Sequence, residues 1–246
     1  MNNDNPMRLV DYDTRVPEEN LALDELLLEK AEKEEIGETL RFWMSDRYFV
    51  VAGRGSRIKE DCRTDNCRRD DVKILRRISG GGTVLQGPGC MNYSMVLSYE
   101  RDSAYRSINA SYRKILGMIA GSFTAKNISA EFSPVSDLSI NGRKFSGNAQ
   151  ARKKKYFLIH GTVLLDFDIP AIARYLKHPG NEPAYRKGRP HGEFVDNIRL
   201  SYPEVIASIG DIFCPGLSWA PDTHDLEKLA EYRVNKYSSE KWNYSF

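Results

Sequence analysis

Two arginines followed by three consecutive glycines form a segment whose residue types are suited to binding an anion. The segment runs from Arg76 to Gly82 (RRISGGG) and directly follows a predicted strand. Consecutive glycines are favoured where the backbone takes positive φ or closely approaches a ligand. Backbone N–H groups freed by such a bend, together with a guanidinium, bind carboxylate or phosphate. The segment therefore predicts an anion site, with a glycine-rich hairpin carrying surface arginines as the alternative.

A lysine beside a predicted tight turn is the second chemical candidate. Asn141-Gly142 lies between two short β-rich stretches, 138–140 and 143–146, and this dipeptide readily takes the positive φ angles of a two-residue hairpin turn. Lys144 therefore lies on a hairpin strand. A compact ammonium offsets the repulsion between a carboxylate and a phosphate that are brought together. An ordinary exposed hairpin lysine is the alternative interpretation.

Both segments, in this order and spacing, resemble the defining segments of the lipoate-protein ligase A family, within the biotin/lipoate ligase superfamily. The matching stretches are 76–97 (RRISGGGTVLQGPGCMNYSMVL) and 136–168 (SDLSINGRKFSGNAQARKKKYFLIHGTVLLDFD). Residues 236–243 (KYSSEKWN) also resemble the end of the family's large domain. The resemblance implies an α/β (α+β) fold with a mixed, mainly antiparallel sheet flanked by helices, and a ligand in a tunnel between sheets.

The resemblance also implies roles for individual residues. Lys144 matches the lysine that contacts the acyl carbonyl and the phosphate of an acyl-adenylate, so it is the expected catalytic residue. Asp137 matches a nucleotide or Mg²⁺ contact, which suits a cation that usually takes one or two protein carboxylates; a turn-forming Ser-Asp pair is the alternative. The other expected binding residues are Arg76, Ser79, Gly80, Gly81, Gly82, Asn92, His160, Gly161 and Thr162. For His160, a hydrogen-bonded core histidine is the alternative.

The activity implied by the resemblance is that of a lipoate-protein ligase. Such an enzyme uses ATP and Mg²⁺ to convert lipoic acid, or octanoate, to the acyl-adenylate. It then transfers the acyl group to a lysine of a lipoyl-domain acceptor protein.

Three departures from the family pattern qualify this expectation. Gln86-Gly87 stands where the family has His-Asp, and 53–57 (GRGSR) weakly resembles biotin ligases instead. The chain reaches Phe246 without the small C-terminal domain of many bacterial ligases. We therefore expect a single catalytic domain over residues 1–246, the accessory domain being absent or supplied by a separate protein.

An acyltransferase that uses a thioester or protein-bound donor is the alternative enzyme. Transferases related to this fold acylate a cysteine, because a thiolate divides one difficult transfer into two easier ones. Their cysteine falls in the segment that here reads 132–135 (FSPV). Cys90 is the substitute candidate, against a small buried cysteine as the ordinary interpretation. A regulator that binds lipoyl groups or nucleotides without catalysis is a third hypothesis.

Composition excludes several other classes of protein. Apolar residues make up 41% and charged residues 28%, with a formal net charge of +2, so no general affinity for nucleic acid is expected. No apolar run approaches the roughly 20 residues of a membrane span, so no membrane partner is expected. Four cysteines and an N-terminus without a signal-peptide pattern predict a cytoplasmic protein.

Periodicity predicts the elements that must position these residues. Helical spacing marks 18–38, 103–123, 170–177 and 222–237, and the many charges of the first helix predict a solvated face. Strands are expected within 40–52, at 74–77, 84–85 and 93–97, in the hairpin around 141–142, and at 156–165. The strands from 40 to 97 predict a β-meander, and 180–193 predicts a basic loop.

Overall fold

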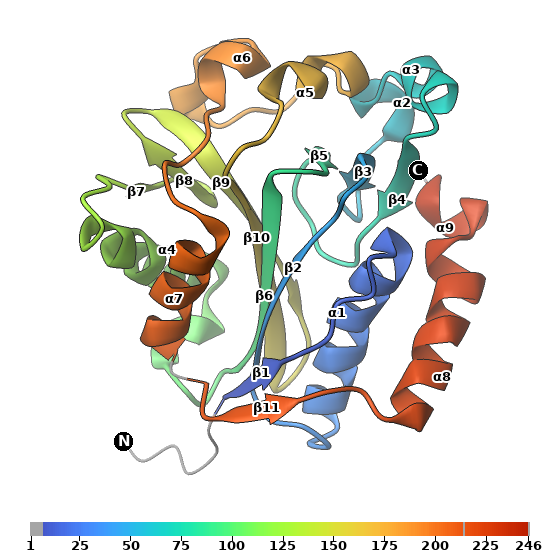
Figure 1. Cartoon of the computed structure of the whole chain (residues 1–246), viewed down its shortest axis with the longest axis vertical. Coiled ribbons are helices and arrows are strands. Elements are labelled where there is room, and N and C mark those ends of the chain that lie inside the picture. Colours follow the sequence, from blue (N-terminus) through green and yellow to red (C-terminus); the bar gives the residue numbers. More distant parts are fainter. Residues whose placement is uncertain (1–6, 214, 246) are drawn as a thin grey trace.

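Two sheets form the centre of the molecule in the computed structural model, which describes residues 7–213 and 215–245 (Figure 1). The larger sheet has the strand order β11-β1-β2-β6-β10-β9-β8-β7 and the smaller has the order β4-β3-β5. The strands of the larger sheet are β1 (Arg8–Val10), β2 (Thr39–Met44), β6 (Cys90–Ser98), β7 (Glu131–Ser133), β8 (Asp137–Ile140), β9 (Arg143–Arg152), β10 (Tyr156–Leu164) and β11 (Leu217–Trp219). Those of the smaller are β3 (Phe49–Ala52), β4 (Lys73–Arg76) and β5 (Val84–Gln86). Of the neighbouring strand pairs, β11–β1, β1–β2 and β3–β4 are parallel. The other pairs are antiparallel, so the predicted mixed, mainly antiparallel fold is confirmed.

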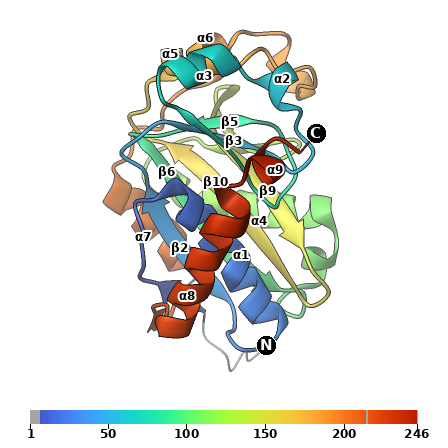
Figure 2. The ribbon, with the colours of Figure 1, turned by 90° about the vertical axis from the view of Figure 1, so that its right-hand side faces the viewer.

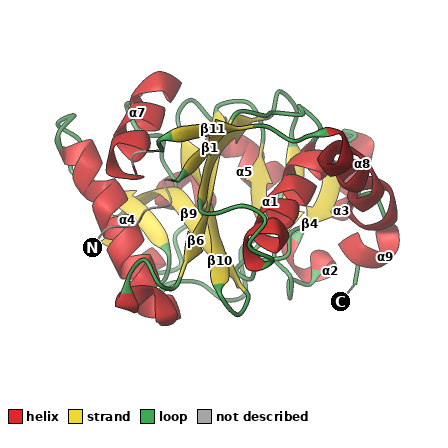
Figure 3. Cartoon of the chain, turned by 90° about the horizontal axis from the view of Figure 1, so that it is seen from below, coloured by secondary structure: helices red, strands yellow, loops and turns green. Residues whose placement is uncertain are grey.

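Helices cover both faces of the larger sheet (Figure 3). Helices α4 (Ile108–Thr124) and α7 (Tyr202–Phe213) lie on one side, while α1 (Pro17–Glu32) and α8 (Thr223–Tyr232) lie on the other. The shorter elements are α2 (Ile58–Asp61), α3 (Thr64–Arg69), α5 (Ile169–Tyr175), α6 (His191–Phe194), α9 (Glu240–Asn243), the 3-10 turns η1 (Ser103–Arg106) and η2 (Ala184–Arg186), and the π-helical turn η3 (Arg233–Tyr237). None of the helices among the described residues has the length and apolar character needed to cross a bilayer.

The central strands divide the apolar side chains between two cores. Along β6, Met91, Tyr93 and Met95 belong to the core that includes α4 and α7. Val96 on β6 and Leu158 on β10 belong to the core under α1. This division follows from the period of two residues by which strand side chains alternate between faces. Both faces of the sheet are therefore buried, which explains the nearly continuous apolar character of the predicted strand at 156–165.

Helix α1 ends six residues before the predicted boundary at Glu38, so that boundary is wrong. Lys33 caps the helix, and Glu34 takes a left-handed conformation with φ of 62°. The amide of Glu34 donates to the carbonyl of Ala31, and that of Glu35 donates to Lys30, both at 2.9 Å. These two bonds form a Schellman motif, which satisfies the last helical carbonyls although no glycine occupies the left-handed position.

The charged face of α1 is an internal contact and not the predicted solvated face. Helix α8 and the turn η3 lie across α1 (Figure 2), and their cations meet its glutamates. The pairs are Arg233–Glu19 at 2.5 Å, Lys236–Glu25 at 2.7 Å and Lys228–Glu29 at 3.3 Å. Acidic residues spaced along one side of α1 therefore bind the C-terminal segment to the rest of the fold.

The predicted β-meander between 40 and 97 is also wrong. Strand β3 does not pair with β2 in the larger sheet. It belongs to the smaller sheet, where it pairs in parallel with β4 and antiparallel with β5. A parallel neighbour needs a crossover connection, which the unpredicted helices α2 and α3 supply. The elements β1, β11 and α7 are likewise absent from the prediction. The separation of β3 to β5 from the larger sheet leaves a space between the two sheets.

Candidate active site

A cavity of about 1110 Å³ lies between the two sheets. Its walls come from β5, β6, β9, β10 and α1, and the connection 177–195 contributes a further wall. The residues expected from the sequence that line it are Gly80, Gly81, Gly82, Asn92, Asp137, Lys144, His160, Gly161 and Thr162. Residues far apart in the sequence are thus gathered around one space.

Strand register places polar residues of β6 and β10 side by side, and of these Asn92, His160 and Thr162 line the cavity. His160 pairs with Ser94, and Thr162 pairs with Asn92. Because strand side chains alternate, these four residues share the face on which Val96 and Leu158 lie. The same face is therefore apolar under the middle of α1 and polar where it reaches the cavity.

Arg77 holds the glycine-rich bend in shape from within. Its guanidinium donates to the carbonyls of Val51 (3.2 Å), Gly80 (2.6 Å) and Gly82 (2.9 Å), and its Nε donates to Ser79 Oγ at 2.9 Å. Burial lowers the pKa of Arg77 to about 10, so the group remains charged near neutral pH. The glycine bend forms one wall of the cavity, and Arg77 adds a fixed positive charge to that wall.

Arg76 and Ser79, which the resemblance also predicts as binding residues, are not among the residues that line the cavity. Neighbouring strand residues point to opposite faces, and Arg76 takes the face directed away from the cavity, towards Trp242 and Asn243. Ser79 is fully buried, and its hydroxyl lies between Arg77 and His160. Both side chains hold groups around the bend, Arg76 the carbonyl of Gly53 and Ser79 the guanidinium of Arg77.

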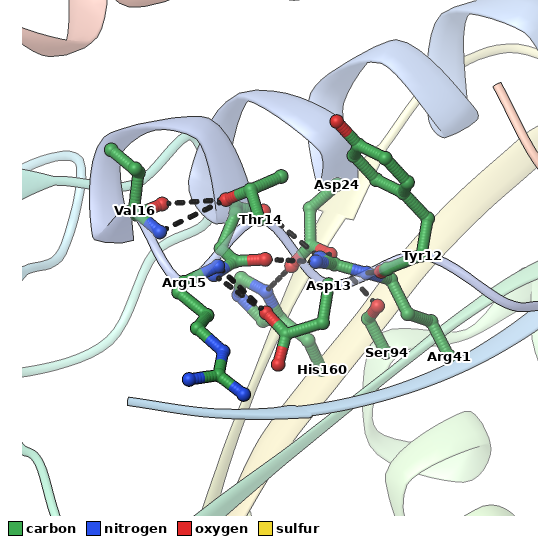
Figure 4. A network of polar contacts seen from close by, with 10 residues as sticks. Tyr12, Asp13, Thr14, Arg15, Val16, Asp24, Arg41, Ser94 and His160 are labelled. Carbon is green, nitrogen blue, oxygen red and sulfur yellow. Dashed lines mark hydrogen bonds and ion pairs between the residues drawn. The ribbon is translucent and has the colours of Figure 1, made fainter. Parts of the chain in front are cut away.

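His160 lies in a buried polar network with Asp24 of α1, Ser94 and Arg41 (Figure 4), and it also contacts Ser79 of the glycine-rich segment. Its Nε2 is 2.6 Å from Ser79 Oγ and its Nδ1 is 2.9 Å from Asp24 Oδ2. Asp24 also accepts from Ser94 at 2.8 Å and pairs with Arg41 at 3.3 Å. Burial alone would raise the pKa of Asp24, but the hydrogen bond and charge of His160, with the charge of Arg41, lower it. The carboxylate is therefore ionised and orients the ring that supports Ser79.

Lys144 and Asp137 form an ion pair on the cavity wall. The predicted turn is confirmed, because Asn141 and Gly142 both have positive φ, 52° and 70°. Lys144 Nζ lies 2.7 Å from Asp137 Oδ1, and the hydroxyl of Tyr185 donates to Asp137 Oδ2 at 2.7 Å. Burial, then the charge and hydrogen bond of Asp137, raise the pKa of Tyr185, which keeps it a donor. The ammonium is thereby held beside the cavity, with 27% of the lysine side chain exposed.

The segment predicted as a basic loop, 180–193, forms part of the cavity wall and contains the short elements η2 and α6. Arg186 is buried, with its guanidinium over the ring of Phe194 at 4.8 Å. Val195 forms a bridge to Lys144, and the amide of Asp196 donates to the Lys144 carbonyl at 2.9 Å. This connection therefore closes the cavity over Lys144.

The described residues fit a magnesium ion shared with a phosphorylated substrate better than a permanent metal centre. No group of three or more His, Cys, Asp or Glu side chains in 7–213 and 215–245 is arranged to hold a metal. Asp137 is a buried carboxylate on the cavity wall. One such carboxylate, completed by phosphate oxygens and water, is the usual protein contribution to Mg²⁺ binding in phosphoryl sites.

One end of the cavity is apolar. Leu21 of α1, Trp43 of β2 and Val51 of β3, which belong to one apolar cluster, contribute to its lining. The other end carries the charges of Lys144 and Asp137. A molecule with a hydrophobic tail and an anionic head therefore matches the lining, because each part meets surface of its own kind.

The cysteines of the described residues are poor nucleophiles. Cys62, Cys67 and Cys90 are buried and none lines the cavity. Burial raises the pKa of the Cys90 thiol to about 12 and that of Cys62 to about 12. A thiolate is the reactive form of cysteine, so Cys90 is not prepared for acyl transfer. Cys214 lies outside the described residues.

Arg77 and Asp24 are charged residues of the site that sequence reasoning missed, as it missed Tyr185. Alternation of side chains predicts that Arg76 and Arg77 point in opposite directions. It could have identified Arg77 as the cavity residue only if the side on which the cavity lies were already known. Asp24 carried a usable signal, because it lies three residues after Leu21 and four before Leu28, on the same side of α1. A carboxylate on an apolar helix face must find a partner, and here the partners are His160 and Arg41.

The chain is similar in sequence to enzymes of a known protein family. The family model described as "Lipoyl protein ligase A/B catalytic domain" matches residues 16–208. A probable lipoate-protein ligase A of Mycoplasma pneumoniae is 33% identical over 164 residues, which are 65% of this chain and 46% of the relative. The chain thus spans about half the length of this relative and of its Mycoplasma genitalium counterpart. An octanoyltransferase LipM of Halalkalibacterium halodurans is 26% identical over 96% of this chain and 98% of its own length.

Solved structures share the fold over nearly the whole chain. A bi-partite lipoate protein ligase of Thermoplasma acidophilum, studied with its E2 lipoyl domain, aligns with a TM-score of 0.81 and 22% identity, covering 98% of this chain and 96% of that one. A lipoate-protein ligase A bound with ATP aligns with a TM-score of 0.81 and 23% identity, covering 97% and 98%. At these identities the likeness establishes the architecture.

Proposed function

The chain belongs to the lipoyl protein ligase A/B catalytic domain family, and we propose that within this family it is a lipoate-protein ligase. In this proposal it uses ATP and Mg²⁺ to activate lipoate or octanoate, and passes the acyl group to a lysine of a lipoyl-domain protein. The observation that carries the proposal is the position of Lys144. Its ammonium lies beside Asp137 in a cavity that is apolar at its other end.

Activation would take place where the acid carboxylate meets the α-phosphate of ATP. A carboxylate oxygen forms a bond to the α-phosphorus, the bond from that phosphorus to the β-phosphate oxygen breaks, and pyrophosphate leaves. The Lys144 ammonium offsets the repulsion of the two anions and stabilises the charge that develops between them. Arg77 adds a fixed positive charge behind the glycine bend, whose backbone faces the same space.

Asp137 would hold Mg²⁺ together with phosphate oxygens, and the ion would supply charge neutralisation for the departing pyrophosphate. Asp137 already contacts Lys144 and Tyr185 in this structure. These two contacts fix the carboxylate and the ammonium relative to each other. The protein thereby holds the groups that must act on one phosphate at a defined separation.

Transfer would follow in the same cavity. The amine of the acceptor lysine forms an amide bond with the acyl carbonyl carbon, the bond from that carbon to the AMP oxygen breaks, and one proton is released. The same ammonium polarises the acyl carbonyl in this step. The apolar end lined by Leu21 and Trp43 would hold the hydrocarbon chain, so that binding energy from the tail positions the reacting carbonyl.

An octanoyltransferase is the second candidate, favoured by the alignment with LipM over 98% of that protein's length. Such an enzyme would accept octanoate from a thioester or protein-bound donor and need no ATP. The described cysteines oppose a cysteine-acyl mechanism, because Cys90 is buried with a raised pKa and Cys62 and Cys67 lie outside the cavity. The ligase therefore remains the first proposal.

One assay separates the two functions. The purified chain is incubated with a lipoyl-domain acceptor and either ATP, Mg²⁺ and free acid, or an octanoyl thioester of acyl carrier protein. It is run with and without the accessory domain of a bipartite ligase. Pyrophosphate release and acceptor mass are measured. A ligase gives pyrophosphate and acylated acceptor from free acid. Acceptor acylation from the thioester alone, with no pyrophosphate, would establish the transferase instead.

A further inference from the structure

The side chain of Arg76 joins two segments that are far apart in the sequence. Its Nη1 donates to the carbonyls of Gly53 (2.7 Å), Arg54 (3.1 Å) and Ser56 (3.0 Å). Its Nε donates to the carbonyls of Trp242 (3.1 Å) and Asn243 (3.2 Å). The side chain is fully buried. One guanidinium thus connects the loop 53–56 to the C-terminal helix α9.

The C-terminal residues in turn hold the backbone of Arg76. The Asn243 side chain accepts from the Arg76 amide at 2.9 Å, and the indole N–H of Trp242 donates to the Arg76 carbonyl at 2.9 Å. Asn243 is itself fixed, because its Nδ2 donates to the Tyr237 carbonyl at 2.8 Å. These contacts continue the edge of β4 and set the position of the residue immediately before Arg77.

The loop 53–56 lies directly against the glycine bend of the candidate site. A Cβ added to Gly53 would lie 2.0 Å from the Gly81 carbonyl oxygen, so the two backbones touch at this point. The amide of Arg54 donates to the Ser79 carbonyl at 2.8 Å, and that of Arg77 donates to the Ala52 carbonyl at 3.0 Å. A displacement of the loop therefore displaces the bend that faces the cavity.

We propose that Trp242 and Asn243 are positioning residues for the anion-binding bend Gly80–Gly82, acting through Arg76 and the loop 53–56. Neither residue lines the cavity, so both act at a distance from the ligand. The nature of that ligand rests on the proposed function. The mechanical coupling itself rests on the hydrogen bonds and close backbone contact described above. The C-terminal helix α9 is thus part of the apparatus that shapes the substrate site.

The test removes one hydrogen bond at a time. Trp242→Phe deletes the indole donor and keeps an aromatic ring, while Asn243→Ala deletes the acceptor for the Arg76 amide. The matched control is Lys228→Met, which breaks the contact between α8 and Glu29 at 3.3 Å without touching Arg76. All variants are made in the full chain and checked by circular dichroism and thermal melting.

Two readouts distinguish positioning from general loosening of the fold. Hydrogen exchange is followed in peptides covering 53–57 and 79–83, and KM for the acid is compared with kcat in the pyrophosphate assay. Loss of one hydrogen bond should raise exchange in both peptides, and KM, by about five- to tenfold, with kcat changed less than about twofold.

The proposal is overturned if exchange in 79–83 is unchanged in Trp242→Phe and Asn243→Ala, or if Lys228→Met accelerates it equally. A wild-type chain that releases no pyrophosphate under any condition would refute the proposed function instead. Exchange in the two peptides would then still decide the coupling, because that readout needs no substrate.

Discussion

Replacing Lys144 with methionine removes the ammonium from the cavity and keeps most of the side-chain volume. In the proposed reaction the ammonium acts on a phosphate separated from it by about 4 Å. Two unit charges at that distance interact by about 4 kcal/mol at an effective dielectric of about 20. That dielectric suits a side chain that is 27% exposed. Expressed in the transition state, the loss corresponds to a rate about a thousandfold lower.

A second variant tests the same charge by displacement. A Cβ added to Gly147 would lie 2.7 Å from Lys144 Nζ. Because Nζ is the end of a flexible side chain, Gly147→Ala should move the ammonium without unfolding the protein. A misplacement of about 1 Å in a reacting group lowers the rate by up to about a hundredfold. Gly147→Ala should therefore fall between wild type and Lys144→Met.

The assay is single-turnover pyrophosphate release with saturating ATP, Mg²⁺ and acid, accompanied by calorimetric titration with the acid. Lys155→Met is the control, because Lys155 pairs with Glu34 at 2.7 Å on the exposed turn between β9 and β10. Acid binding should change little in all three variants. If Lys144→Met retains more than about a tenth of the wild-type rate, the assigned role of the ammonium is wrong.

Three other variants test different parts of the site. Gly53→Ala places a Cβ 2.0 Å from the Gly81 carbonyl oxygen and should weaken acid binding, measured by calorimetry, at least about tenfold; unchanged affinity would contradict the close packing. Asp24→Asn should lower the free energy of unfolding in denaturant by about 3 to 5 kcal/mol at neutral pH, since it removes the carboxylate that pairs with the fully buried Arg41 guanidinium. The folded pKa of Asp24 is lowered, so its contribution is complete above the unfolded pKa and disappears as pH falls through the folded value. The difference between wild type and Asp24→Asn should therefore shrink only below about pH 4, and a difference that grows in acid would reverse the assignment. Cys90→Ala should keep acceptor acylation within about threefold of wild type because the thiol is buried and protonated; complete loss with a folded protein would favour a cysteine-acyl mechanism.

The parts of the site that could be predicted from the sequence are those defined by local chemistry. Asn141-Gly142 specifies its turn through backbone conformation alone, so the hairpin that carries Lys144 followed directly. Three consecutive glycines likewise mark a backbone bend wherever they occur. The mixed, mainly antiparallel sheet was predicted from the family resemblance, and the observed strand pairs confirm it.

The direction in which a side chain points was harder to predict than the place of its segment in the fold. Arg76 ends β4 and Arg77 follows it directly, and in an extended backbone two neighbouring side chains face opposite ways. Which of them faces the cavity depends on where α9 packs, and α9 lies more than 160 residues further along the chain. The local sequence pattern contains no information about that contact, so the prediction named Arg76 and not Arg77, which lines the cavity.

Contacts between residues far apart in the sequence were also beyond what the local pattern could predict. Strands β1 and β11 have three residues each, too few for periodicity to mark. The partner of Asp24 in the site is His160, 136 residues away. The glutamates of α1 predicted a solvated face because most charged helical faces are exposed, and their true partners come from the far end of the chain.

These glutamates make the attachment of the C-terminal segment sensitive to dissolved electrolyte. The paired side chains keep between 13% and 42% of their surface exposed, so mobile ions reach them. At 1 M salt the screening length falls to about 3 Å, close to the separation of each pair, while burial of Leu229 and Tyr237 remains favourable. Ionic strength therefore weakens one set of contacts between α1 and the C-terminal helices and leaves the other intact.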